Sequence, residues 1–372
     1  MKRIAIIGGG IAGLSLSIDL RQRGFDVVLI EKGSYPRHKV CGEYISMESR
    51  AYLESVCPVL SKLQLPVIDQ FKLSSTGDIS YSTKLDPGGF GISRYLLELM
   101  LYNQATELGV VVMLNCKASH FMLDEKSGNY TITTNAGAIQ AALICNASGR
   151  KSNFETQART VTSLGNTNYI GIKYHVTLDR NPKLIEIHNF PGGYCGISSI
   201  EDQQACLCYI VNSEALKNSG NSIPNLERSV LFQNKELKKL FHYAQFKTAH
   251  PLTISGINFL IKSPVSEDSI FVGDSAGSIA PITGNGMSIA LRSASALAET
   301  IDYYFSKGLP TKQLMRSYSD FWNKEFSSRI KLSRYFQKLS EYPLLTNFTI
   351  RLMNSFPIIG RKIISQTHGQ PF

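Results

Sequence analysis

The sequence predicts an α/β fold in which a parallel sheet carries an inserted antiparallel sheet and a helical C-terminal segment follows. Three observations predict this class. Residues 3–22 and residues 269–305 each combine an apolar, strand-like run with glycines and a helix-like run. Residues 162–211 alternate in the manner of antiparallel strands. Residues 306–372 interleave basic and apolar side chains at roughly helical spacing.

The composition is that of an ordinary globular protein. The 372 residues are 43% hydrophobic and 18% charged, which excludes disordered and fibrous classes. No apolar run reaches the ~18 to 20 residues of a membrane-spanning helix, so we expect a cytoplasmic protein without membrane spans. The seven cysteines include no CxxC pair, which favours free thiols and gives no sign of a metal site.

The first glycine cluster follows a short buried strand. Residues 3–7 are almost wholly apolar, as expected of a parallel strand covered on both faces. Gly8, Gly10 and Gly13 then have the G-x-G-x-x-G spacing. In that pattern the three glycines provide a tight turn, close backbone approach to a pyrophosphate and close packing of helix on strand. We therefore expect a dinucleotide to bind here.

The residues around this turn support the same interpretation. A helix that begins near Ile11 and Ala12 directs its unsatisfied N–H groups at a phosphate. A second strand then delivers Glu31, followed by Lys32, about twenty residues after the first glycine, where an acidic group can accept hydrogen bonds from ribose hydroxyls. The alternative, a signal peptide, has a shorter apolar core and no glycine pattern.

A second glycine-rich element lies near residue 270. The strand "SIFVGD" ends in an acidic residue that can bind a polyol hydroxyl, and the turn "GNGM" exposes N–H groups at a helix N-terminus. Such a turn suits the pyrimidine carbonyl and the negative charge of a reduced flavin. The predicted cofactor-binding residues of this element are Gly273, Asp274, Pro281, Gly284, Gly286 and Met287.

These motifs resemble the para-hydroxybenzoate hydroxylase-type flavoproteins, which include aromatic hydroxylases, geranylgeranyl reductases and flavin halogenases. "GGGIAG…E" and "GDSAG…P…GNGM" carry the resemblance, together with "GISRYLLELMLYNQATELGV" and "PRHKVCGEYIS". The last resembles the K-x-C-G-E loop of geranylgeranyl reductase-like members. The resemblance implies FAD, a Rossmann-like FAD-binding domain of the glutathione-reductase type, and flavin contacts from Arg37, Cys41, Gly42, Glu43 and Arg94.

The resemblance also implies a division of the chain. The discontinuous FAD-binding domain is expected at residues 1–75, 95–155 and 250–305. A β-sheet substrate domain is expected at residues 76–94 and 156–249, with its pocket at the domain junction. Residues 306–372 form a basic helical tail, in which eleven Lys and Arg accompany three Asp and Glu and so supply eight of the ten net positive charges.

Departures from the family pattern concern the chemistry. Ser148 replaces the Asp of the Ala-Asp-Gly motif of NADPH-reduced hydroxylases, or Asn146 replaces the Asp of the halogenase-like "DASG" variant. The electron donor is therefore left open between NAD(P)H and a reduced protein partner. Gly196 stands where geranylgeranyl reductases and halogenases usually place a tryptophan. Candidate catalytic residues are Cys41, as a reactive thiol or a packing residue, and Tyr44 and Tyr194 as proton donors or hydrogen-bond partners.

Three functions remain open at this point. The first is a monooxygenase that hydroxylates a lipophilic, phenolic or polyketide-like molecule. The second is an ene reductase that saturates a polyprenyl chain, favoured by "KVCGEYIS", and the third is a flavin-binding protein without turnover. The expected partner is a hydrophobic small molecule. The basic tail can dock on an anionic membrane surface or be an ordinary packed helix, and no nucleic-acid-binding motif is present.

Overall fold

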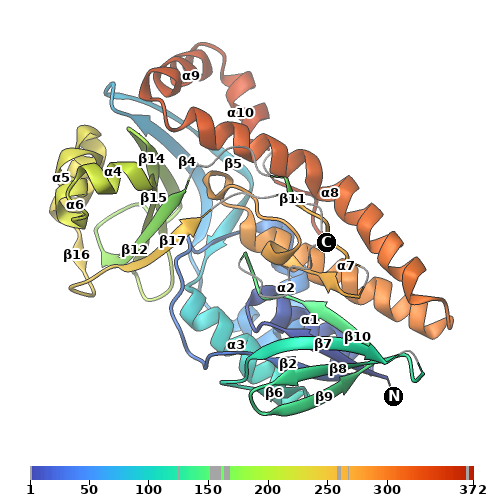
Figure 1. Cartoon of the computed structure of the whole chain (residues 1–372). Coiled ribbons are helices and arrows are strands. Elements are labelled where there is room, and N and C mark those ends of the chain that lie inside the picture. Colours follow the sequence, from blue (N-terminus) through green and yellow to red (C-terminus); the bar gives the residue numbers. More distant parts are fainter. Residues whose placement is uncertain are drawn as a thin grey trace.

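A parallel sheet forms the first layer of the computed structural model, which describes residues 2–124, 126–150, 161–162, 168–257, 261–266, 268–365 and 368–372. The strand order is β19-β10-β1-β2-β6 (Figure 1). These strands are β1 (Arg3–Ile7), β2 (Asp26–Ile30), β6 (Val111–Met113), β10 (Leu143–Asn146) and β19 (Ile270–Phe271). Segments far apart in the chain therefore meet in one sheet, which confirms the predicted α/β class.

Each face of this sheet is covered, which explains why its strands are continuously apolar. On one face, Ile4 and Ile6 pack with helices α1 (Ile11–Gln22), α3 (Arg94–Glu107) and α7 (Gly286–Ser306). On the other face, Ala5 and Ile7 pack with a three-stranded antiparallel sheet. That sheet consists of β7 (Ala118–Asp124), β8 (Asn129–Thr134) and β9 (Gly137–Ala141), which the sequence analysis did not single out.

The second layer is a nine-stranded sheet of order β16-β12-β15-β14-β13-β4-β5-β3, with β17 also paired to β12. Its strands are β3 (Tyr44–Ser46), β4 (Val67–Ser75), β5 (Ile79–Gly91), β12 (Tyr169–Thr177), β13 (Leu184–Phe190), β14 (Gly193–Ser199), β15 (Ala205–Asn212), β16 (Gln245–Phe246) and β17 (Leu252–Ile257). Helices α4 (Ser213–Asn218), α5 (Ile223–Ser229) and α6 (Lys235–Tyr243) lie on one side of it (Figure 1).

The boundaries of the predicted domains differ from this arrangement. Strands β3 and β4 belong to the nine-stranded sheet although they lie within the predicted FAD-binding segment 1–75, and β17 belongs to it although it lies within 250–305. Strand pairing is made by backbone groups, so these strands carry no side-chain signal of the sheet they join. The predicted boundary at residues 155–156 lies outside the described residues.

The C-terminal residues are helical, as predicted. They form α8 (Thr311–Leu339), α9 (Pro343–Ser355) and α10 (Pro357–Ser365). One further helix, α2 (Arg50–Val56), lies much earlier in the chain. The inner face of α8 joins the main core through Leu314, Tyr318, Trp322, Phe326 and Ile330. Within the described residues no helix is both long enough and apolar enough to cross a bilayer.

Truncation of Phe326 tests whether α8 is part of the folding unit. The ring is fully buried and lies 4.7 Å from that of Trp322. Phe326→Ala is expected to lower the free energy of unfolding by about 3 to 5 kcal/mol, since it removes buried area and leaves a cavity. Urea denaturation measures the change, with the exposed Lys331→Ala on the same helix as control. Equal stability of the two variants would contradict the integral packing of α8.

Candidate functional site

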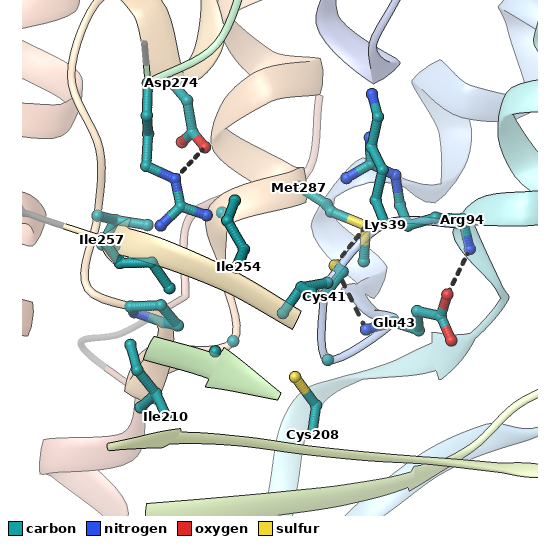
Figure 2. Close-up of a pocket in the computed structure, with 18 of the residues that line it drawn as sticks. Lys39, Cys41, Glu43, Arg94, Cys208, Ile210, Ile254, Ile257, Asp274 and Met287 are labelled. Atoms are coloured by element: carbon teal, nitrogen blue, oxygen red, sulfur yellow. Dashed lines mark hydrogen bonds and ion pairs between the residues drawn. The ribbon is translucent and has the colours of Figure 1, made fainter. Parts of the chain in front are cut away.

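One continuous pocket of about 1200 Å³ extends from the first glycine turn to the C-terminal helices. Figure 2 shows part of its wall, where Cys41, Met287 and Cys208 face the same space. The predicted residues that line it are Gly8, Gly10, Ile11, Ala12, Glu31, Lys32, Arg37, Cys41, Gly42, Glu43, Tyr44, Arg94, Tyr194, Asp274, Pro281, Gly284, Gly286 and Met287. Gly13 and Gly273 lie outside this lining.

The glycines of the first turn have the separate tasks that their spacing predicts. Gly8 has φ +108°, and a Cβ there would lie 2.5 Å from the carbonyl oxygen of Ala147. A Cβ on Gly13 would lie 1.9 Å from the Gly8 carbonyl oxygen, so this glycine sets the close packing of α1 on β1. A Cβ on Gly10 would find its nearest atoms at 3.7 Å, on Lys39, and would project into the pocket.

The N-terminus of α1 is suited to a phosphate group. Gly10 is its N-cap and supplies no side-chain hydrogen bond, and Ile11 and Ala12 of the first turn line the pocket. The first N–H groups of a helix lack intrahelical partners and lie at the positive end of its dipole. This cradle therefore fits the pyrophosphate of a dinucleotide.

Glu31 is held at the end of β2 by three donors. Its carboxylate accepts hydrogen bonds from the Gly9 N–H at 2.6 Å, the Gly33 N–H at 2.8 Å and Arg37 Nη1 at 2.6 Å. Burial acts to raise the pKa of Glu31, but Arg37 and the Gly9 and Gly33 N–H groups together lower it overall. An ionised carboxylate offers about four lone-pair positions, so one remains for a ribose hydroxyl.

Three cations converge on Glu98 beside this turn. Arg37 Nε lies 3.1 Å from Glu98 Oε2, Lys39 Nζ lies 3.1 Å from Oε1, and Arg94 Nη2 also pairs with Oε1. Burial acts to raise the pKa of Glu98, yet Arg94, Lys39 and Arg37 together lower it to about 2. Burial, with Arg94, lowers the pKa of Lys39 to about 8. Sequence reasoning found Arg37 and Arg94 but missed Lys39 and the central carboxylate.

A second buried carboxylate, Glu43, fixes the Cys41–Glu43 loop. Glu43 has φ +56° and is fully buried. Its Oε1 accepts hydrogen bonds from Lys173 Nζ and from the Arg94 N–H at 2.7 Å, while Oε2 lies 2.6 Å from His175 Nε2. Burial acts to raise the pKa of Glu43, but His175 and Lys173 lower it overall. Figure 2 shows Glu43 beside Arg94.

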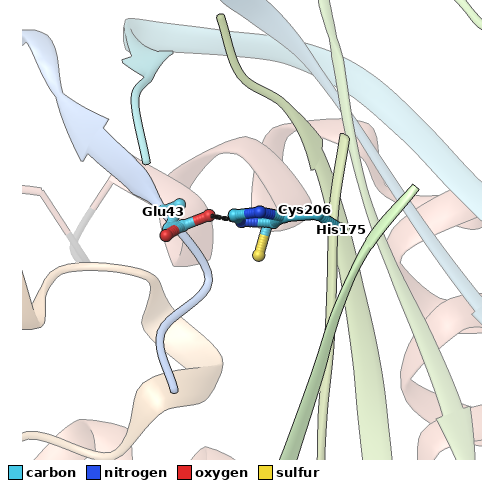
Figure 3. Close-up of side chains that lie close together, drawn as sticks. All are labelled: Glu43, His175 and Cys206. Atoms are coloured by element: carbon cyan, nitrogen blue, oxygen red, sulfur yellow. Dashed lines mark hydrogen bonds and ion pairs between the residues drawn. The ribbon is translucent and has the colours of Figure 1, made fainter. Parts of the chain in front are cut away.

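Glu43, His175 and Cys206 bring three potential metal-ligand atoms within 4.8 Å of one another (Figure 3). The sequence had given no sign of a metal site. The three groups already have protein partners, because Lys173 binds the carboxylate and Cys206 Sγ donates to the Cys41 carbonyl at 3.1 Å. Burial also raises the pKa of the Cys206 thiol far above its usual value, which opposes the thiolate that metals prefer.

The missed residues Lys173 and His175 carried a usable signal. They lie two apart in "YIGIKYHV", and alternate residues of a strand face the same side of its sheet. Polar side chains on a buried side of a strand need hydrogen-bond or ion-pair partners there. The partner, Glu43, comes from a loop 130 residues away, so only the fold reveals the pair.

The second glycine-rich element also lines the pocket and packs beside α1. Asp274 Oδ2 lies 3.5 Å from Arg150 Nε, and Gly284 has φ +68° just before α7 begins at Gly286. Met287 Sδ lies 3.7 Å from Cys41 Sγ (Figure 2). The turn and the Cys41 loop thus border the same part of the pocket, as the two motifs predict for a flavin.

The far part of the pocket is apolar. It is lined by strand residues Phe71, Leu85, Ile185 and Ile187 and by helix residues Phe336, Leu339, Met353, Ile363 and Ile364. Tyr44 lies at its edge, with Oη 3.3 Å from His368 Nε2. Burial raises the pKa of Tyr44, and that of Tyr194, above the usual value, so both phenols remain protonated at neutral pH. Their catalytic role, like that of Cys41, stays a prediction.

Comparison with known proteins agrees with this geometry. The family described as "FAD dependent oxidoreductase" matches residues 3–40, the strand, glycine turn and helix. Conditioned medium factor receptor 1 of Dictyostelium discoideum is 23% identical over 363 residues, which cover 89% of this chain and 69% of that protein. The family match supports FAD and an FAD-dependent oxidoreductase, but it contains nothing specific to geranylgeranyl reductases.

Two solved structures share the fold. The flavin-dependent brominase Bmp2 has a TM-score of 0.79 at 19% identity, over 97% of this chain and 92% of that one. Halogenase PltM in complex with phloroglucinol and FAD has a TM-score of 0.77 at 17% identity, over 98% of this chain and 82% of that one. At these identities the likeness establishes the fold of flavin-dependent oxidoreductases.

Gly10→Val tests the phosphate cradle. The new side chain projects into the pocket rather than into protein atoms, so we expect a folded protein that no longer retains FAD after gel filtration. Absorbance of the flavin and circular dichroism measure the two properties. Gln22→Val, at the exposed end of the same helix, is the control and should keep its FAD. A yellow Gly10→Val protein would refute the placement.

Glu98→Gln tests the charge cluster through stability. A carboxyl whose pKa falls from 4.5 to about 2 on folding contributes about 3 kcal/mol above pH 4.5, and this is lost as pH falls toward 2. Glu98→Gln should therefore be less stable than the wild-type protein by about that amount at pH 7, with a difference that shrinks in acid. Chemical denaturation across this pH range measures it, with exposed Glu107→Gln on α3 as control. A pH-independent difference would contradict the assignment.

Proposed function

We propose that the chain is an FAD-dependent monooxygenase-type enzyme that acts on a lipophilic small molecule. The observation that carries the proposal is the continuity of the pocket, from the glycine turn of α1 to an apolar chamber under α8, α9 and α10. A site of this form can hold a dinucleotide at its polar end and a hydrophobic molecule at the other. The relatives of similar fold include enzymes named as flavin-dependent halogenases, which supports oxygen-linked flavin chemistry.

FAD, when bound, supplies the redox chemistry by taking electrons from a donor and passing them to oxygen or to the substrate. The residues that would hold it are those of the first glycine turn, Glu31, Arg94, Asp274 and the turn before α7. The first turn of α1 and the surplus positive charge of Arg37, Lys39 and Arg94 favour an anionic pyrophosphate. The neutral phenols of Tyr44 and Tyr194 can donate hydrogen bonds to a polar group of the substrate.

The specific assignments as a halogenase or as a geranylgeranyl reductase have less support than the monooxygenase. Gly196 lines the pocket where both families usually place a tryptophan, and a Cβ at this position would make only ordinary contacts. An ene reductase saturating a polyprenyl chain stays the second candidate, because the Cys41 thiol of the "KVCGEYIS" loop lines the pocket beside Met287. The electron donor is proposed to be NAD(P)H or a reduced protein, and the location cytoplasmic.

Isotope incorporation separates the candidates. Holoenzyme is reduced with dithionite and mixed with phloroglucinol under heavy-isotope oxygen gas, or without oxygen with geranylgeranyl diphosphate. We expect heavy oxygen in a hydroxylated product, because a monooxygenase transfers an oxygen atom from O₂ to its substrate. Mass spectrometry measures both reactions, and protein lacking FAD is the control. Saturation of the prenyl probe without oxygen would instead establish the reductase.

A further inference from the structure

The outer surface of α9 and α10 carries exposed apolar side chains together with cations. We call this surface the terminal patch; it consists of Leu344, Leu345, Phe348, Arg351, Phe356, Ile358, Ile359, Arg361 and Lys362. Leu344, Phe348 and Ile358 are 83%, 67% and 73% exposed. Soluble monomers rarely leave several large apolar side chains together in water, so such a patch indicates an interaction site.

The helical spacing places apolar and basic groups on the same outer faces. Leu344, Phe348 and Arg351 recur at i, i+4 and i+7 on α9, and Ile358, Arg361 and Lys362 recur at i, i+3 and i+4 on α10. The opposite faces are packed. Thr346, Ile350 and Met353 of α9 are buried, and Gly360 of α10 lies against Tyr81. The patch is therefore the solvent-facing side of two helices whose other sides pack on the protein.

The charge of this surface is of one sign. From residue 342 to the C-terminus the sequence contains Arg351, Arg361 and Lys362 and no Asp or Glu. The exposed acidic side chain on the adjoining β4–β5 turn, Asp78, is paired with Lys235. An apolar face whose own charged side chains are all cations complements an anionic lipid surface, where acyl chains contact the apolar groups and headgroups pair with the cations.

We infer that the terminal patch docks the protein on an anionic lipid bilayer. The helices lie in the interface, since neither is long enough to cross a membrane. Figure 1 shows α9 and α10 at the end of the molecule opposite the parallel sheet, so docking leaves the dinucleotide end accessible. The inner sides of the same helices line the apolar chamber through Thr346, Met353 and Ile364. If the substrate is lipophilic, as proposed above, it has a short path from the bilayer.

Vesicle flotation tests the docking independently of any reaction. Full-length holoenzyme is mixed with vesicles of phosphatidylcholine, with or without phosphatidylglycerol. We expect flotation with the anionic vesicles, weakened by salt, and far less with the neutral ones. The triple variant Arg351→Ala, Arg361→Ala and Lys362→Ala should lose about a hundredfold in partitioning, since each cation near an anionic surface contributes roughly fivefold. Lys217→Ala, Lys238→Ala and Lys239→Ala, on α4 and α6, form the matched control.

A second variant separates the apolar contribution from folding. Phe348→Asp places a charge on the exposed face, so its thermal unfolding should be unchanged while its flotation is lost. Met122→Asp, at an exposed apolar position of β7, is the control and should float normally. The inference is overturned if anionic vesicles bind no protein at low salt, or if light scattering shows a dimer that Phe348→Asp converts to a monomer. Flotation without turnover would leave docking intact and contradict only the proposed function.

Discussion

The buried Glu43 carboxylate is the contact on which the arrangement of the site depends. It receives Lys173 and His175 from β12 of the nine-stranded sheet and the backbone N–H of Arg94 from the start of α3. One side chain therefore joins the large sheet to the helix that packs beside α1. A buried carboxylate is costly unless it is paired, so loss of either partner would release the Cys41–Glu43 loop from its place on the pocket wall.

A second consequence is the separation of charge along the pocket. Arg37, Lys39 and Arg94 surround one carboxylate, Glu98, near the first turn of α1, so the dinucleotide end keeps an excess of positive charge. The chamber under α8 is lined mainly by aliphatic and aromatic side chains. The polar and the apolar parts of the cavity are thus lined by different elements, and the Cys41 loop also lines the cavity. This division follows from the positions of two loops rather than from one strand or helix.

The sequence predicted those parts that local geometry determines. The spacing of Gly8, Gly10 and Gly13 could be recognised in the sequence because the three glycines belong to one strand–turn–helix unit. The close approach of Gly8 to Ala147 could not be, because Ala147 comes from a distant part of the chain. Only the Arg94–Glu98 pair is local, because the two residues are four apart on α3. The partners of Glu43, and the contacts of Glu98 with Arg37 and Lys39, could not be predicted, because they depend on which strands, loops and helices lie side by side. The same limit explains the displaced domain boundaries. Strands β3, β4 and β17 join the large sheet through backbone hydrogen bonds, so their side chains do not indicate which sheet they belong to.

The C-terminal helices show a further limit of pattern reading. On α9 the residues Ile350 and Met353 face the interior, whereas Leu344 and Phe348 face outward, so the helix is apolar on two sides. A periodic pattern cannot distinguish a side that packs on the protein from one that needs an external partner. Burial makes the distinction, and the distribution of cations supports the anionic lipid surface that we infer as the partner. The chamber and the terminal patch are opposite sides of the same two helices, because Thr346 and Met353 of α9 line the pocket while Leu344 and Phe348 of the same helix are exposed.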